Sequence, residues 1–394
     1  MKAMSEKIKT AWIVSIVLMF LLCLVELFSL TFLHAWDLAR PYLGRPHEQL
    51  GFNQGEEQKQ VFSEVMNFKH YHYKAFVEWK NTEFKGKYLN IDGDGRRVTG
   101  FEAQNPLVPT LRYFGGSTMW GYGVTDKSTI PVLIGSKVTL NAVNYAEQAY
   151  NSRQSLNVLI EHLGAIRPGD LIIFYDGVND SHNCLRENST NGHVRERYIE
   201  DALLKARMLE EGLAEDISVG KLLWKLYQKT NLYQLILKAK RKVLSGEMAV
   251  DDTTPGSDHF VCNDQAKAEE VANFLVTSWK AAETIAQRAG AHFACVLQPN
   301  PYTLSMQPHF YSEGLAQSSK TVYSKVREKA KGLECFVDLS ELLTSDNYFD
   351  ACCHVNRRGN EEIADLLISK VIGPRTKGAT DVAQRLRVPY TPDR

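Results

Sequence analysis

The feature that most constrains the fold is a series of short, almost wholly apolar segments separated by stretches with helical spacing. The clearest of these segments, "DLIIFYDG" at 170–177, has no charged residue from Leu171 to Tyr175. Such runs are typical of strands buried on both faces of a parallel sheet that helices cover. Similar segments lie at 111–116, 140–146, 291–299 and 332–340. The pattern predicts an α/β protein with about five parallel strands between two layers of helices.

The intervening stretches predict the helices and the limits of the domain. Helical spacing occurs at 129–138, where Pro131 suits the first turn, and at 152–166, 265–290 and 359–372. The alternation stops after Ser181. We therefore predict one α/β domain from 110–184 and 262–375, interrupted by a helical cap insertion at 185–261. Residues 35–109 are expected to pack on this domain as an approach segment, and 376–394 to form a tail.

The N-terminal region contains an apolar run from Ala11 to Leu33 with one charged residue, Glu26. About 20 such residues span a bilayer core. Lys2, Lys7 and Lys9 precede the run and favour a cytoplasmic N-terminus. No short apolar core with a small-residue cleavage site is evident, which favours an uncleaved anchor over a signal peptide. Residues 1–34 are thus predicted to be a cytoplasmic tip and a single-pass helix, with the remainder periplasmic or extracellular. A charge in lipid marks a position for a helix partner.

The net charge argues against nucleic acid binding, and an incomplete motif argues against calcium binding. The formal net charge is zero, so no basic field indicates nucleic acid binding. The stretch at 90–100 imitates a calcium loop with Asn90, Asp92, Asp94 and Gly95. The twelfth position of such a loop is a bidentate Glu, and here it is Phe101. A glycine-containing β-turn is the favoured interpretation.

Six of the seven cysteines follow the apolar run, and they are Cys184, Cys262, Cys295, Cys335, Cys352 and Cys353. An even number in an oxidising compartment permits disulfides in several pairings. Cys295 and Cys335 lie in strand-like runs and are predicted to be buried thiols. Cys184 and Cys262 bracket the insertion, so a bond between them would clamp a cap. The competing pairing joins either of them to Cys352 or Cys353.

Polar residues follow two of the predicted strands and also lie in the loop before the final helix. Ser117 comes after Gly115-Gly116, Asn179 lies in "DGVND", and Asp350 and His354 lie in "FDACCHVN". Functional sites of open α/β sheets form where the carboxyl ends of strands converge. A serine becomes a nucleophile when a histidine, oriented by a carboxylate, takes its proton, and an amide can stabilise the oxyanion. Separately each residue fits a turn, a cap or a surface position; together they predict an acyl-transfer site.

These motifs resemble the SGNH hydrolases of the GDSL esterase/lipase superfamily, particularly exported, membrane-anchored, bacterial-type members. The resemblance covers roughly residues 110–185 and 265–373. "FGGSTMWGYG" is similar to the first family block, "DGVND" to the third and "DACCHVNRRGNEEIAD" to the fifth. It implies a flavodoxin-like three-layer α/β/α sandwich, with Ser117 as nucleophile and oxyanion donor, Asn179 as side-chain donor, and His354 with Asp350 as base and partner. It implies no metal and no organic cofactor.

Two positions depart from the family pattern. Ala149 stands where a glycine usually donates its N–H to the oxyanion, and Ala146 stands where another glycine is common. The N–H survives if the local backbone suits alanine. Asp350 lies four residues before His354, whereas three is usual. Either the loop absorbs the additional residue, or a backbone carbonyl orients His354.

The resemblance implies a serine esterase acting on acyl esters, expected to be O-acetyl groups of an envelope or secreted polysaccharide. The expected partners are therefore an acylated glycan or lipid ester, the membrane, and envelope polysaccharide machinery. The alternatives are a polysaccharide O-acetyltransferase, a lipid esterase or lysophospholipase, and a catalytically retired binding protein. Val219–Leu244 is basic with near-helical apolar spacing, so it could lie on anionic lipid, although packing as a cap is favoured.

Overall fold

The structure is a computed structural model of all 394 residues. It describes residues 2–39, 60–102, 108–185, 262–303 and 313–376, apart from positions 62, 66, 67, 69, 263 and 351. It also describes residues 192, 193, 203, 227, 230–233, 235 and 236. Most of the predicted cap, including most of Val219–Leu244, and the tail lie outside the described residues.

The chain divides into two compact units, 1–47 with 195–255, and 48–194 with 256–394. The strands of the second unit are β1 Tyr71–Lys74, β2 Glu78–Asn81, β3 Phe84–Lys85, β4 Asn90–Ile91, β5 Thr110–Gly115, β6 Asn141–Asn144, β7 Leu171–Asp176, β8 His292–Leu297 and β9 Phe336–Asp338. Its helices are α3 Ser117–Trp120, α4 Ile130–Gly135, α5 Ser152–Glu161, α6 Val178–Ser181, α10 Gln265–Arg288, α11 Glu313–Ala330 and α12 Arg357–Leu367. The first unit contains α1, Lys2–Ala39.

Five strands form one parallel sheet in the order β6-β5-β7-β8-β9. Numbered along the chain, this is the flavodoxin-like order 2-1-3-4-5, with its switch point between β5 and β7. All five predicted strands are present. The sheet confirms the predicted fold class, and the switch point is where the loops after β5 and β7 diverge to leave room for a site.

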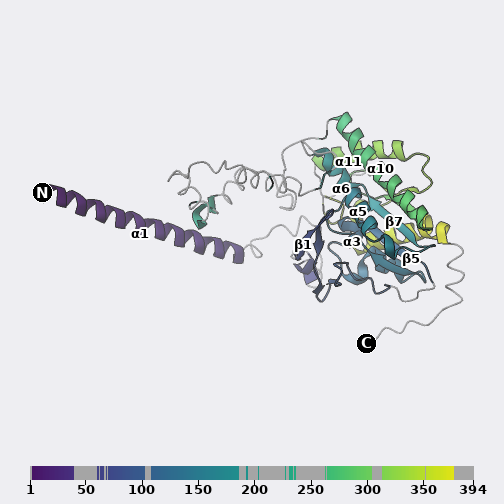
Figure 1. Ribbon diagram of the computed structural model, residues 1–394, viewed down its shortest axis with the longest axis horizontal. Coiled ribbons are helices and arrows are strands. Elements are labelled where there is room, and N and C mark those ends of the chain that lie inside the picture. The colour runs from purple at the N-terminus through teal and green to yellow at the C-terminus, as the bar shows by residue number, and fades with distance from the viewer. Residues whose placement is uncertain are drawn as a thin grey trace. The chain divides into compact units, whose positions relative to one another are not determined.

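Helices cover both faces of this sheet (Figure 1). One core contains Phe114 and Phe174 together with buried residues of α5, α10 and α11. The other contains Tyr113 and Tyr175 with buried residues of α4 and α12. Neighbouring residues of one strand thus point into opposite cores, because side chains alternate across a strand. The molecule has the three layers that the apolar strands predicted.

Two parts of the second unit were not predicted. Helix α11 was not predicted because its buried face includes small or polar side chains such as Ala316 and Ser319, which give a weak periodic signal of hydrophobicity. The hairpins β1–β2 and β3–β4 lie in the approach segment, whose short strands carry no clear alternation. The stretch at 90–100 contains a β-turn, as predicted, since the Gly95 N–H donates to Asp92 O (2.9 Å) with Gly95 at φ +74°.

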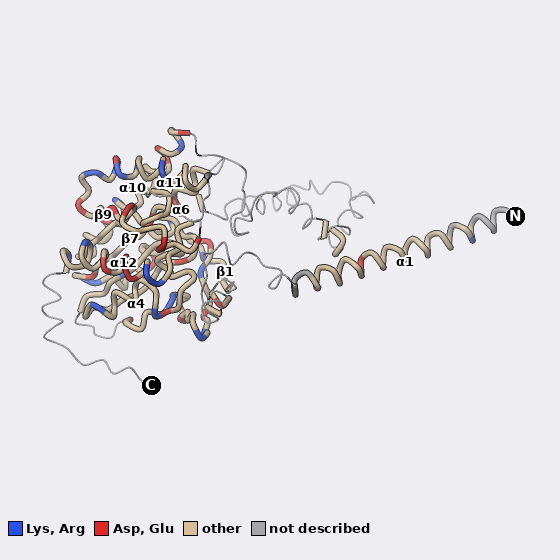
Figure 2. The backbone as a smooth tube through the Cα atoms, turned by 180° about the vertical axis from the view of Figure 1, so that it is seen from behind, with Lys and Arg blue, Asp and Glu red and all other residues tan. Residues whose placement is uncertain are grey.

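In the first unit, Ile8–Ala35 of α1 is the one stretch among the described residues that is long and apolar enough to cross a membrane, at 28 residues. Between Thr10 and Trp36 it has one charged residue, Glu26, whereas both signs of charge are spread over the second unit (Figure 2). The Glu26 carboxylate accepts N–H groups from Asn231 (2.5 Å) and Leu232 (3.1 Å). Within the first unit, the Glu26 carboxylate is therefore bound by backbone of the insertion.

A disulfide joins Cys184 to Cys262, with their Cα atoms 5.2 Å apart. The bracketing pairing is confirmed, and the competing pairings with Cys352 or Cys353 are wrong. Cys295 and Cys335 are buried thiols, as predicted. The two ends of the insertion are therefore held together where it leaves the α/β unit.

Arg97, from the approach segment, is buried beneath the loop that follows α3. Its Nε donates to Asp126 (2.8 Å), its Nη2 to Val124 O (2.6 Å) and its Nη1 to Gly121 O, and the guanidinium lies 4.8 Å from the centre of the Trp120 ring. Its side chain has no exposed area. Such a charge is tolerated in a core only when all its donors are used.

We expect Arg97→Met to lower the free energy of unfolding by about 3–5 kcal/mol, because it removes one partner of a buried pair and takes the guanidinium donors away from three backbone carbonyls. Arg96→Met is the matched control. Arg96 pairs with Asp92 and with the largely exposed Asp94, so its loss should cost about 1 kcal/mol or less. Urea unfolding followed by tryptophan fluorescence measures both values. Equal losses would contradict the role of Arg97.

Candidate active site

The predicted site residues converge at the carboxyl edge of the sheet, beside the switch point. Ser117 is the first residue of α3, immediately after β5, and Asn179 lies in α6, immediately after β7. Asp350 and His354 lie in the loop between β9 and α12. Parallel strands place their following loops on one edge, which brings residues from distant parts of the sequence together.

Ser117, His354 and Asp350 form a continuous hydrogen-bonded relay. His354 Nε2 lies 2.7 Å from Ser117 Oγ, and His354 Nδ1 is bonded to Asp350 Oδ2. The side chains of His354 and Asp350 are 12% and 18% exposed. Burial opposes ionisation of Asp350, yet the charge and hydrogen bonds of His354 hold the pKa of this carboxyl below its usual value. Asp350 is therefore ionised at neutral pH and can stabilise a protonated His354.

The additional residue between Asp350 and His354 is absorbed by the loop. Asp350 Oδ1 accepts the N–H groups of Cys352 (2.9 Å), Cys353 (3.1 Å) and His354 (3.2 Å). One carboxylate oxygen thus holds the loop backbone while the other holds the imidazole. The structure selects the first of the two predicted alternatives, since the Asp350 side chain and not a carbonyl contacts His354 Nδ1.

Two aromatic rings that the sequence analysis missed flank the imidazole. The Tyr122 ring centre lies 4.4 Å from that of His354, and the Phe349 ring stacks at 5.8 Å. Tyr122 belongs to the first motif and Phe349 adjoins the fifth, so their positions in the motifs were the available signal. The rings limit rotation of His354 and keep Nε2 directed at Ser117.

Asn179 lies against the backbone that carries Ser117. Its side-chain amide donates to Tyr150 O (2.7 Å). A Cβ placed on Gly116 would lie 2.3 Å from Asn179 Nδ2, so only glycine allows this approach. The amide has two N–H groups, and the bond to Tyr150 leaves the other for an oxygen beside Ser117.

Ala149 adopts a backbone conformation that favours glycine, with φ +61°. The Ala149 N–H was expected to remain available only if the local backbone suits alanine, and the observed φ explains why glycine is the usual residue here. Within the described part of the chain, no acceptor bonds the backbone N–H of Ala149 or of Ser117. The arrangement therefore offers two backbone donors and one amide for an oxyanion.

The loop that contains Ala149 is held by the approach segment, a contact the sequence analysis missed. The fully buried Glu147 carboxylate accepts N–H groups from Asn81 N (3.2 Å) and Nδ2 (2.7 Å), and Trp79 Nε1 donates to Gln148 O (3.0 Å). Burial raises the pKa of Glu147. Strand β2 thus fixes the backbone that presents the Ala149 N–H.

A second buried carboxylate joins the Asn179 helix to α5. Asp180 accepts from Ser152 Oγ (2.6 Å) and Ser152 N (3.2 Å), at the first turn of α5. Burial raises the pKa of Asp180 to about 6. The bond couples the position of Asn179 to the helix that follows the Ala149 loop.

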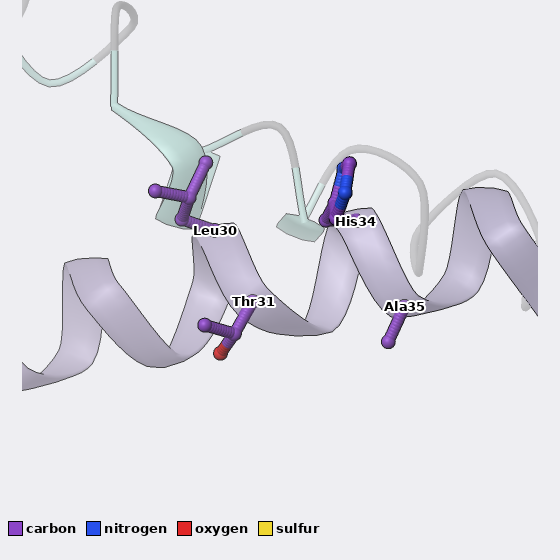
Figure 3. Close-up of a pocket in the computed structure, with 4 residues that line it drawn as sticks. All are labelled: Leu30, Thr31, His34 and Ala35. Atoms are coloured by element: carbon purple, nitrogen blue, oxygen red, sulfur yellow. The ribbon is translucent and has the colours of Figure 1, made fainter.

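Two other features do not extend the site. The donor atoms of Cys352, Cys353 and His354 lie within 4.8 Å of one another, as a metal site requires, but both ring nitrogens of His354 are bonded within the relay. Figure 3 shows a hollow on α1 lined by Leu30, Thr31, His34 and Ala35. Its lining contains none of the relay residues.

Comparisons with known proteins identify solved structures but no sequence family. No family model matches the chain, and no curated protein matches its sequence. A lipolytic G-D-S-L protein from Veillonella parvula is 13% identical, with 67% of this chain and 98% of that chain covered and a TM-score of 0.36. The esterase EstA from Pseudoalteromonas sp. is 12% identical over 67% and 97%, with a TM-score of 0.35. The acetyl xylan esterase Est2A from Butyrivibrio proteoclasticus is 9% identical over 73% and 68%, with a TM-score of 0.35.

The left-handed backbone at Ala149 leads to a paired prediction. Ala149→Gly should leave the free energy of unfolding unchanged or raise it by up to about 1 kcal/mol, because relief of strain offsets the added freedom of the unfolded chain. The turnover rate should change less than twofold or so, since the N–H stays. Ala146→Gly, a buried position without positive φ, should destabilise by about 1 kcal/mol. Denaturant unfolding distinguishes the two, and a destabilised Ala149→Gly would contradict the assigned strain.

Proposed function

We propose that the chain is a serine ester hydrolase of the SGNH type. The observation that carries the proposal is the relay from Asp350 through His354 to Ser117, 2.7 Å at its last bond, located at the switch point of a flavodoxin-like sheet. A relay of this composition activates a serine hydroxyl. A binding protein that had lost catalysis would not need the hydrogen bonds of this relay.

In the proposed reaction, Ser117 Oγ attacks the ester carbonyl as His354 Nε2 takes its proton. The Asp350 carboxylate stabilises the imidazolium. The Ser117 and Ala149 N–H groups and the Asn179 amide bind the oxyanion, and His354 then protonates the leaving alcohol. Water, activated by the same imidazole, releases the acid from the acyl-serine. Each group already lies at the switch point, so little reorganisation is needed.

The proposed substrate is an acylated, specifically O-acetylated, polysaccharide of the cell envelope. This assignment follows from the motif resemblance together with the candidate membrane helix Ile8–Ala35. With Lys2, Lys7 and Lys9 retained in the cytoplasm, the α/β unit would be periplasmic or extracellular. The Cys184–Cys262 disulfide supports an oxidising location. An acetyl group needs little acyl-side space, so selectivity would reside in the glycan.

Ser117→Ala should abolish ester cleavage, because it removes the atom that becomes acylated. The full-length protein in detergent is assayed on acetyl, long-chain and acetylated-glycan esters, with a serine-directed phosphonate as the label. The matched control is Ser136→Ala, an exposed serine at the end of α4, which should behave as the wild type. Phosphonate labelling that persists in Ser117→Ala would place the nucleophile elsewhere. Preference for long-chain over acetylated-glycan esters would favour the lipid esterase.

Asn179→Ala should lower kcat by roughly 10²–10³-fold while KM changes little, since the amide acts on the oxyanion rather than on the bound ester. Steady-state kinetics on a soluble acetyl ester measure both constants. Asn183→Ala, a buried asparagine beyond α6, is the control and should retain kcat if the protein folds. An unchanged kcat in Asn179→Ala would reduce this residue to holding the Tyr150 carbonyl.

A further inference from the structure

The six cysteines that follow the apolar helix occur as three pairs in the structure. Cys184 and Cys262 form a disulfide. The sulfurs of Cys295 and Cys335 lie 3.0 Å apart, and those of Cys352 and Cys353 lie 3.2 Å apart. A disulfide indicates an oxidising compartment. The thiols of the other two pairs therefore occur where oxidation is available.

The Cys352–Cys353 pair lies within the catalytic loop. Its backbone N–H groups donate to the Asp350 oxygen that shapes the loop, and its next residue is His354. On the other side, Thr118 Oγ1 donates to Cys353 O (3.3 Å) and lies 3.6 Å from Cys353 Sγ. Thr118 directly follows Ser117. A change in this pair therefore acts on both ends of the relay.

We propose that Cys352 and Cys353 are an oxidation site whose vicinal disulfide switches the hydrolase off. The inference rests on the proposed function, since the switch acts on that relay. Forming the bond requires the sulfurs to approach from 3.2 Å to about 2.05 Å. The peptide between them must turn, which removes the Cys353 N–H from Asp350 and displaces His354.

The oxidant is a disulfide, either of a small thiol or of a protein that donates disulfides in the same compartment. The half-buried Cys352 is the accessible member, and its thiolate attacks the donor to give a mixed disulfide and one released thiolate. Cys353 thiolate then attacks Cys352 Sγ and releases the second. Two protein thiols are oxidised and one donor disulfide is reduced, so the electrons balance. The hydrogen bond with Cys352 and the nearby His354 lower the pKa of Cys353, which favours this thiolate.

The vicinal bond would be reduced more easily than the disulfide at the base of the insertion. Neighbouring Cα atoms are about 3.8 Å apart across a trans peptide, whereas bridged cysteines usually have Cα atoms about 4.4–6.8 Å apart. A vicinal disulfide is therefore strained, and strained disulfides are reduced more easily. Mild reductant should restore activity before it opens Cys184–Cys262.

The test treats the full-length enzyme with oxidised glutathione and measures peptide masses and acetyl-ester hydrolysis in parallel. Trypsin releases 332–357, which contains Cys335, Cys352 and Cys353. After oxidation, the alkylated peptide should show an internal Cys352–Cys353 bond. The hydrolysis assay should show about a 100-fold lower kcat, the order expected for a misplaced base. Cys352→Ser should hydrolyse the ester at the same rate with and without oxidised glutathione. A Cys184→Ser/Cys262→Ser double variant should still lose activity, which separates the switch from the cap.

Two results would overturn the inference: thiols at Cys352 and Cys353 that resist oxidation, or an oxidised pair with undiminished hydrolysis. Cys353→Ser gives a second variant if Cys352→Ser fails to fold, and it should be equally insensitive to the oxidant. A reduced wild-type enzyme that cleaves no ester would instead refute the proposed function. In that case the peptide masses still decide whether the vicinal bond forms.

Discussion

The site depends first on the parallel pairing of β5 with β7. Gly115 pairs with Tyr175, and a Cβ on Gly115 would lie 2.4 Å from the Tyr175 carbonyl, so the two strands approach as closely as a glycine permits. Because the strands end together, the residues that follow them emerge at the same edge. Gly116 then admits the Asn179 amide. The absence of a side chain at Gly115 and Gly116 thus sets the distance between the proposed nucleophile and its amide donor.

The rest of the site is assembled from elements distant in sequence. His354 and Ser117 are 237 residues apart, and the Glu147–Asn81 contact joins the oxyanion loop to β2 across 66 residues. The approach segment is therefore part of the catalytic unit rather than a spacer, since it braces the Ala149 loop through β2 and the loop after α3 through Arg97. Each brace is a buried charge that has a partner of opposite charge as well as neutral hydrogen-bond partners: Arg97 pairs with Asp126 (2.8 Å), and Glu147 lies 3.9 Å from Lys80.

Much of the fold could be predicted from the sequence because five buried strands leave clear runs of apolar residues. Ser117 and Asn179 directly follow two of these strands, and His354 lies in the loop before the final helix. The left-handed φ of Ala149 could not be predicted, since an alanine there is held by surrounding contacts that no local pattern records. The Glu147 brace and the rings beside His354 likewise arise from tertiary packing. Helix α11 was missed because small buried side chains give little periodicity.

The disulfide between Cys184 and Cys262 closes the intervening chain, 78 residues in separation, into a ring with a base of 5.2 Å between Cα atoms. The spacing of that base is independent of the path taken within the ring. Loop-closure entropy also grows slowly with length. A chain of another length could therefore join the same two cysteines without changing the spacing of this base. Exchange of the insertion between the two cysteines could in this way adapt one catalytic domain to different substrates.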